Sequence, residues 1–159
     1  MRISFTLNGK YVTANAPPSQ RLVDLLRGEM SVKGLHPSCY NGHCGNCAIL
    51  FNGELVYACL LPAFAAEDAY IHTYEGIRRS TGYEDILQGL EEADARPCPY
   101  CLPSKVIIVQ SILETTLEPT SSYIYEAFSG TYCPCTNFNR LVRGVQISAE
   151  LRRKRLAEG

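Results

Sequence analysis

The residues with the clearest chemical potential in this 159-residue chain are its eight cysteines. They form two groups of four, and each group is built from closely spaced members. The first group is Cys39, Cys44, Cys47 and Cys59, and the second group is Cys98, Cys101, Cys133 and Cys135. Four converging thiolates are a frequent ligand set for zinc and for iron–sulfur clusters. The spacing therefore predicts two four-thiolate metal sites in one chain.

The first group reads C-x4-C-x2-C with a fourth cysteine further on, which is a ligand spacing of [2Fe–2S] clusters. Each iron in such a cluster takes two thiolates and two bridging sulfides. Gly42 and Gly45 lie between the cysteines, and they permit positive φ angles that turn backbone N–H groups toward the sulfurs. This pattern favours [2Fe–2S] over zinc and indicates one-electron transfer. His36 and His43 flank the loop, but four cysteines leave no ligand position for a histidine.

The second group is ambiguous when it is taken alone. Cys98 and Cys101 form a C-x2-C pair, which is a common half of a zinc site. Cys133 and Cys135 are separated by one residue, which is less typical of zinc. Zinc and [2Fe–2S] are therefore both open for this group.

Disulfide bonds are the other use of eight cysteines, and they form in oxidising compartments. The N-terminal sequence alternates polar and apolar residues, so it does not resemble a signal peptide, and no stretch approaches about 18 apolar residues. We therefore expect a cytoplasmic protein with reduced thiols and no membrane span. The net charge is −1 and charged residues make up 19% of the chain, so no basic field indicates nucleic-acid binding.

The elements around the first group are expected to be strands and one helix. Residues 3–13 and 48–57 each contain an Asn-Gly turn signal between alternating apolar residues, which predicts two hairpins. A short helix should lie between them, with Ser19 as its N-cap and Gly28 near its end. A further strand is expected at residues 69–73. These elements describe a small β-grasp domain of ferredoxin type.

Helical periodicity replaces the hairpin pattern after residue 75. We therefore expect an α+β protein with a [2Fe–2S] domain at residues 1–75 and an all-α four-helix domain at residues 76–159. The two cysteine pairs of the second group should lie on connections between its helices. The positive N-terminal ends of the helices that follow these connections would then favour an anionic cluster.

Polar and special residues mark the expected ends of these helices. Pro119 should end the second helix, and Ser121 or Ser122 should cap the third. Gly130 should end the third helix, and the fourth should begin after Asn137.

The chain resembles the iron–sulfur subunit of molybdenum hydroxylases, the xanthine dehydrogenase and aldehyde oxidase family, over nearly all of its length. The family's first motif, C-x-x-G-x-C-G-x-C, is matched at residues 39–47, and Cys59 matches its fourth ligand. Its C-x-x-C and C-x-C motifs are matched by the second group, and its Pro-Thr dipeptide by residues 119–120. The resemblance therefore implies a second [2Fe–2S] cluster in place of zinc.

The resemblance also implies a place in an electron relay. In this family a molybdenum–pterin subunit hydroxylates a substrate with water, and electrons pass through two [2Fe–2S] clusters to FAD. Cys98, Cys101, Cys133 and Cys135 would hold the cluster near the molybdenum cofactor, and Cys39, Cys44, Cys47 and Cys59 the cluster near FAD. The chain would be a non-catalytic subunit of an oxidoreductase, with no catalytic residue of its own. Its partners would be the molybdenum-cofactor and FAD subunits, and the substrate pocket would belong to another chain.

Two alternatives remain beside the relay. The chain could be a freestanding ferredoxin-like carrier, or a paralogue in which the second site holds zinc or nothing. Prolines replace the usual glutamine, glycine and arginine of the family at Pro97, Pro99 and Pro134. Proline has no backbone N–H, so these changes predict an altered potential for the second cluster or a different contact with the pterin.

Two other features have simpler interpretations. Tyr40, Tyr100 and Tyr132 lie beside cysteines, and we expect them to shield the clusters and pack in interfaces. The basic run at residues 152–155 would be either a solvated helix end or a docking site for an acidic patch of a partner.

Overall fold

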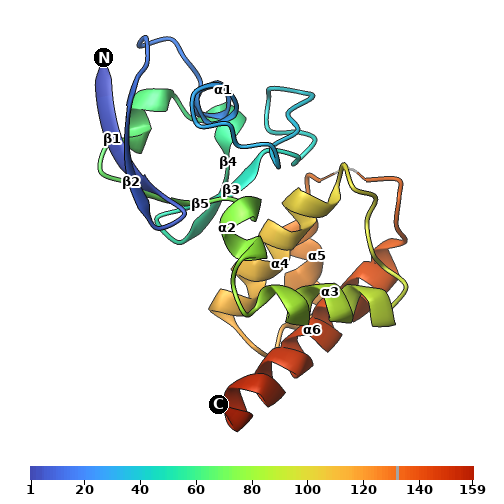
Figure 1. The fold of residues 1–159 in the computed structure, drawn as a ribbon. Helices are drawn as coiled ribbons and strands as arrows, with labels where there is room; N and C mark the ends of the chain where they lie inside the picture. Colours follow the sequence, from blue (N-terminus) through green and yellow to red (C-terminus); the bar gives the residue numbers. More distant parts are fainter. Residues whose placement is uncertain (132) are drawn as a thin grey trace.

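The computed structural model describes residues 1–131 and 133–159, in which a five-stranded sheet precedes a group of helices (Figure 1). The first part contains β1 (Arg2–Leu7), β2 (Lys10–Asn15), α1 (Leu22–Gly28), β3 (Ala48–Phe51), β4 (Glu54–Tyr57), the 3-10 helices η1 (Ala58–Leu60) and η2 (Ala63–Ala66), and β5 (Tyr70–His72). The second part contains α2 (Tyr74–Arg78), α3 (Tyr83–Glu92), α4 (Leu102–Thr115), α5 (Ser121–Phe128) and α6 (Phe138–Glu158).

Both predicted hairpins are confirmed, and their turns explain why. Asn8 and Asn52 each have a φ of 50°, and Gly9 and Gly53 follow with φ angles of 83° and 84°. Two successive positive φ angles define a type I′ turn, whose twist matches that of the strands it joins. The turns therefore fix the register of β1 with β2 and of β3 with β4.

The strand order of the sheet is β2-β1-β5-β3-β4. β1 and β5 are parallel, and the other neighbouring pairs are antiparallel. Helix α1 supplies Leu22, Leu25 and Leu26 to a buried core that also contains Phe5 and Ile71 from the sheet. The structure thus confirms the predicted domain of strands packed on one helix.

The predicted N-cap of α1 is wrong. The N-cap is Arg21, not Ser19, and its side chain makes no capping hydrogen bond. The start of the helix is instead fixed by a distant segment of backbone. The Leu22 N–H donates to the Leu61 carbonyl over 2.8 Å, and Arg21 forms an isolated antiparallel β-bridge with Pro62. The predicted end near Gly28 is correct.

The sheet and the helical part share an apolar interface. Ala48 and Leu50 on β3 belong to the core of the helical part, whereas Ile49 between them belongs to the core around α1. This division follows from the alternation of side chains along a strand. Helices α2 and α4 accordingly lie beside the sheet in Figure 1. The expected boundary between residues 75 and 76 falls inside α2, so a helical turn connects the two parts.

The second part contains the four expected helices, α3 to α6, with the short α2 added before them. The predicted stop at Pro119 is wrong, because α4 already ends at Thr115. The predicted cap of α5 at Ser121 or Ser122 is also wrong, because the Thr120 hydroxyl accepts the hydrogen bond from the Tyr123 N–H over 3.2 Å.

The other two predicted helix ends are correct. Gly130 follows the end of α5 with a φ of 77°, which is the conformation of a C-terminal glycine. The Asn137 side chain caps α6 by accepting hydrogen bonds from the backbone N–H groups of Asn139 and Arg140.

In the basic run at the C-terminal end of α6, Arg153 and Lys154 are exposed, as a solvated helix end would be, but two arginines have another role. Arg152 is buried, and its Nε lies 3.3 Å from a carboxylate oxygen of Asp85 on α3. Its guanidinium also donates to the Gly82 carbonyl and to the Gln110 side chain. Arg155 reaches the same Asp85 carboxylate over 2.9 Å. These two arginines therefore connect α6 to the rest of the helical part.

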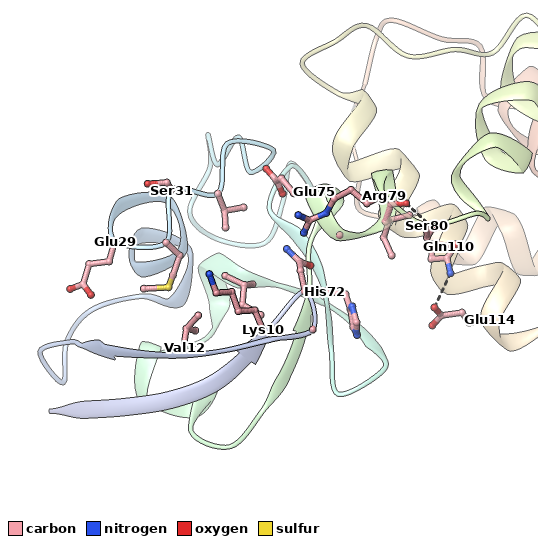
Figure 2. Close-up of a pocket in the computed structure, with 17 residues that line it drawn as sticks. Lys10, Val12, Glu29, Ser31, His72, Glu75, Arg79, Ser80, Gln110 and Glu114 are labelled. Atoms are coloured by element: carbon pink, nitrogen blue, oxygen red, sulfur yellow. Dashed lines mark hydrogen bonds between the residues drawn. The ribbon is translucent and has the colours of Figure 1, made fainter.

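A groove of about 810 Å³ lies between the two parts of the chain (Figure 2). Lys10 and His72 reach it from the sheet, and Arg79, Gln110 and Glu114 reach it from the helices. None of the residues that line it is a cysteine. The groove is therefore separate from both groups of cysteines.

Among the residues that the structure describes, no helix is both long enough and apolar enough to cross a membrane.

Candidate iron–sulfur sites

The β3–β4 hairpin positions two cysteines of the first group. Cys47 directly precedes β3 and Cys59 lies in η1, directly after β4. Since Ala48 pairs with Tyr57 across the hairpin, the two cysteines are brought to the same end of it. Both are buried, and the Cys59 thiol is near enough to help raise the pKa of Cys47.

The other two cysteines of the first group lie on the loop between α1 and β3. The Sγ atom of Cys39 accepts hydrogen bonds from the backbone N–H groups of Asn41, His43 and Cys44, over 3.4, 3.1 and 3.2 Å. Gly42 has a φ of 78° within this loop, as expected, and the positive φ lets successive N–H groups turn inward. Such donors stabilise a negatively charged sulfur.

The thiols of this group differ in how easily they ionise. Burial acts to raise the pKa of Cys44, but hydrogen bonds from the Ser38 side chain and from nearby backbone N–H groups outweigh it and lower that pKa to about 6. Burial raises the pKa of Cys47 to about 12, and the neighbouring Cys59 thiol adds to this effect. A cationic metal core would offset the cost of ionising this buried pair, because bound metal favours the thiolate form.

The chemistry of this donor set fits a [2Fe–2S] cluster. The loop supplies one adjacent pair, Cys39 and Cys44, and the hairpin supplies a second pair, Cys47 and Cys59. A core with two irons requires two thiolates for each iron. These four residues would hold such a core, with backbone N–H groups directed at its sulfur ligands.

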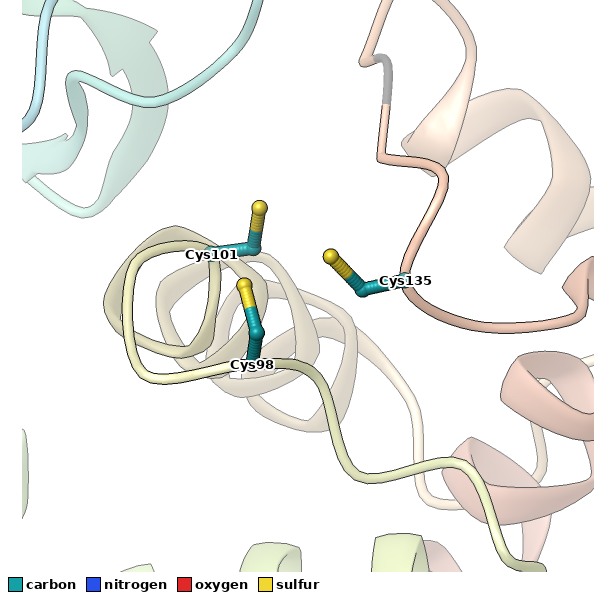
Figure 3. A group of neighbouring side chains, drawn as sticks. All are labelled: Cys98, Cys101 and Cys135. Carbon is teal, nitrogen blue, oxygen red and sulfur yellow. The ribbon is translucent and has the colours of Figure 1, made fainter.

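The second group converges from two connections between helices (Figure 3). Cys98 precedes α4, Cys101 is its N-cap, and Cys135 lies between α5 and α6. Their sulfur atoms point toward one another and all lie within 4.8 Å of one another. The Cys133 thiol interacts with the thiols of Cys101 and Cys135. The structure thus brings the thiols of Cys98, Cys101 and Cys135 together and leaves Cys133 outside this close group, in a donor set that suits zinc as well as a [2Fe–2S] cluster.

The thiols of this second group differ in how easily they ionise, because burial raises the pKa of Cys101 and the hydrogen bond with Cys98 raises the pKa of Cys135. The Cys135 thiol and the backbone N–H groups of Cys101 and Tyr100 hydrogen-bond to the Cys98 sulfur and lower its pKa. The positive N-terminal end of α4 begins at Cys101. Pro99 removes one N–H beside Cys98, but the next two residues supply donors in its place.

The two cysteine loops contact each other directly. The Ser104 hydroxyl, one turn into α4, donates to the Asn46 side chain over 3.2 Å, and both groups are buried. Gly45 packs against Thr131 so closely that a Cβ atom on it would lie 2.6 Å from the Thr131 Cγ2. Residues that lie close in sequence to the cysteines therefore hold the two candidate sites in a fixed position relative to each other.

The tyrosines beside the cysteines have separate roles. The Tyr100 ring stacks on His36 with centroids 4.5 Å apart, so it packs between the two loops as expected. Tyr40 is partly exposed and lies under the Arg21 guanidinium, 5.3 Å from it. Tyr132 lies outside the residues that the structure describes.

Sequence reasoning missed Asn46, Ser104, Lys105 and Thr131. Lys105 carried a visible signal, because it lies three residues after Leu102 and so shares the buried face of α4. The other three are polar residues of ordinary spacing. Their importance comes from contacts across the interface between the two parts of the chain.

The Gly45 contact allows a stability prediction. Gly45→Ala should destabilise the protein more than Gly53→Ala, by about 1–3 kcal/mol, because the first adds overpacking against Thr131. Gly53 is a matched control, since it also has a positive φ but nothing lies within 4 Å of its added Cβ. Denaturant unfolding of the two variants measures the difference. Equal losses would contradict the close packing of the two loops.

Known protein families match both parts of the chain. Residues 5–71 match the 2Fe-2S iron-sulfur cluster binding domain, and residues 73–146 match a [2Fe-2S] binding domain. The fold and the two groups of thiols thus define a two-cluster iron–sulfur protein. The second match also decides between zinc and iron at the helical site, in favour of [2Fe–2S].

Relatives of similar length give the family. The chain is 32% identical to the nicotinate dehydrogenase small FeS subunit of Eubacterium barkeri, over 93% of this chain and 94% of the relative. It is 34% identical to a probable xanthine dehydrogenase subunit of Bacillus subtilis (strain 168), over 97% and 89% of the two chains. The quinoline 2-oxidoreductase structure from Pseudomonas putida 86 superposes with a TM-score of 0.86 at 31% identity, covering 96% of each chain. The chain belongs to the family of small [2Fe–2S] subunits of molybdenum hydroxylases.

Family membership makes the chain an electron-transfer subunit of the xanthine dehydrogenase type. Several relatives are subunits of multi-subunit dehydrogenases, among them the caffeine dehydrogenase subunit gamma of Pseudomonas sp. (strain CBB1). This relationship favours the subunit over the freestanding carrier.

Proposed function

We propose that the chain transfers electrons from a molybdenum-cofactor subunit to an FAD subunit of one complex. The observation that carries this proposal is the direct packing of the two cysteine loops through Asn46, Ser104, Gly45 and Thr131. Two redox sites whose loops pack directly on each other are well placed for electron transfer from one to the other.

The proposed ligands are the two groups of cysteines. When bound, the two clusters would each supply one-electron chemistry, with plant-type potentials near about −400 mV and wide tuning by charge and exposure. The ligands near FAD would be Cys39, Cys44, Cys47 and Cys59. The ligands near the molybdenum cofactor would be Cys98, Cys101, Cys133 and Cys135. The domain division at residue 75 stays part of this proposal.

The exposure of the second site supports its position next to a partner. Cys135 and the adjacent Pro134 are exposed, and Tyr100 is 49% exposed beside Cys98. Three residues after Cys135, the exposed Phe138 ring stacks on the Tyr125 ring. Exposed aromatic residues around a redox site suit contact with another subunit, because aromatic residues are enriched in interfaces.

Three prolines lie next to cysteines of the second group, and they would change either the second cluster or its contact with the pterin. Pro97 is buried, so it packs within the chain, whereas Pro99 and Pro134 face solvent. None of the three can donate a backbone hydrogen bond. We infer that the potential of the second cluster differs from that of relatives without these prolines, or that the partner holds its pterin by other groups.

Purification from the native host tests the proposed complex. Tagged chain should elute with molybdenum and FAD, each near a 1:1 ratio to the chain, because the partners would be permanent. Metal analysis and flavin absorbance measure these ratios. Elution of the chain alone, with intact clusters, would show a freestanding carrier.

A further inference from the structure

A buried lysine lies beside the second group of cysteines. Lys105 is 3% exposed and is placed in the first turn of α4, four residues after Cys101. Its Nζ donates to the Thr131 hydroxyl over 2.9 Å and lies 5.3 Å from the centre of the Phe128 ring. Thr131 is two residues before Cys133. The lysine thus connects the two segments that carry the second group.

Lys105 has no ordinary counter-ion. Within residues 1–131 and 133–159, none of the six ion pairs includes it. Burying a cation away from water is unfavourable unless a negative group compensates. The aromatic ring and the hydroxyl compensate only in part, since neither carries a charge.

The groups near Lys105 that would become negative with a cluster bound are thiols of the second site, and the Lys105 backbone N–H donates to the Cys101 carbonyl over 3.2 Å. Burial lowers the pKa of Lys105, whereas the charges of Cys133 and Cys101 act to raise it. Both cysteines belong to the proposed ligand set. A cluster bound by four thiolates is anionic, so it would be the missing counter-ion of the buried lysine.

We propose that Lys105 is a positioning residue that places a buried positive charge beside the second [2Fe–2S] cluster and raises its reduction potential. This inference rests on the ligand set of the proposed function. Reduction adds one electron and no proton to the site, so its charge becomes more negative by one unit. A nearby cation stabilises the reduced state more than the oxidised state, and burial keeps solvent and salt from screening it.

The effect should be selective for one of the two clusters. Lys105 connects the segments before Cys133 and after Cys101, whereas it reaches the first group only indirectly, through the packing of Thr131 on Gly45 and through the contact of the neighbouring Ser104 with Asn46. The first cluster is therefore an internal reference in the same molecule. A general loosening of the fold would shift both clusters, but a charge at Lys105 shifts mainly the second.

Redox titration of the cluster-loaded protein, followed by EPR spectroscopy, tests the proposal. Lys105→Met keeps an unbranched apolar side chain, one atom shorter, and removes the charge. We expect the equilibrium constant for one-electron reduction of the second cluster to fall at least tenfold, which corresponds to about 59 mV. The first cluster should shift by less, and Lys105→Arg should restore most of the potential. An unchanged second potential in Lys105→Met would overturn the proposal.

A second variant tests the proposal in the case that Lys105→Met loses its iron and has no second cluster to titrate. Thr131→Val keeps the lysine but removes the hydrogen bond that holds its Nζ near the site. A lower potential of the second cluster in this variant supports the proposal, and an unchanged potential refutes it. The iron content of the unmodified chain separates failure of this proposal from failure of the proposed function. A single cluster in that chain would contradict the ligand set and not the role of Lys105.

Discussion

Cys101→Ala is expected to remove one cluster and leave the other intact. Two [2Fe–2S] clusters contain four irons, so the iron content should fall from about four to about two per chain. Cys101 is the buried N-cap of α4, and its sulfur lies within 4.8 Å of those of Cys98 and Cys135. Alanine would leave three thiolates where a two-iron core requires four.

The reciprocal variant is the control for this prediction. Cys47→Ala should also halve iron and sulfide, but it should remove the EPR signal that Cys101→Ala retains. Each part of the chain has its own apolar core, so loss of one cluster should not unfold the other part. Loss of the same signal in both variants, or full iron in either, would be inconsistent with two independent sites.

Asp85→Ala should strongly destabilise the helical part. Arg152 would keep its contacts with the Gly82 carbonyl and the Gln110 side chain but lose its buried carboxylate, which lies 3.3 Å away. Leaving one member of a buried ion pair without its partner costs about 3–5 kcal/mol. In a protein of this length, that loss corresponds to a fall in Tm of roughly 10 °C. Thermal unfolding of the cluster-loaded protein measures it.

Glu150→Ala is the matched control, because Glu150 also pairs with a basic residue of α6. Its partner is Lys154, 3.4 Å away, and both side chains are more than half exposed. An exposed pair of this kind contributes about 0.3–0.5 kcal/mol. Similar losses in the two variants would mean that the Asp85 contact adds little to stability.

Local signals predicted the elements that depend on local chemistry. The Asn8–Gly9 and Asn52–Gly53 turns need two positive φ angles, which these residue pairs adopt readily, and both hairpins are present. Gly130 ends α5 for a similar reason. The start of α1 was wrong because it depends on the Leu61 carbonyl, a partner 39 residues away from Leu22.

The candidate sites show the same division between local and distant information. Cysteine spacing was enough to find two groups of thiols, and Gly42 was enough to predict N–H groups turned toward sulfur. Spacing did not separate zinc from iron at the second group, because both accept four thiolates in close pairs. The contact of Ser104 with Asn46 joins residues 58 apart in the sequence, so only the packed fold reveals it. The pairing of Arg152 with Asp85 was missed for the same reason.

Iron and acid-labile sulfide analysis of the anaerobically purified chain tests the central claim most directly. Two [2Fe–2S]-binding domains predict about four irons and four sulfides per chain, with no stoichiometric zinc. EPR spectra of the reduced protein should then contain two distinct signals. Two irons and two sulfides per chain, with or without one zinc, would contradict the two-cluster relay.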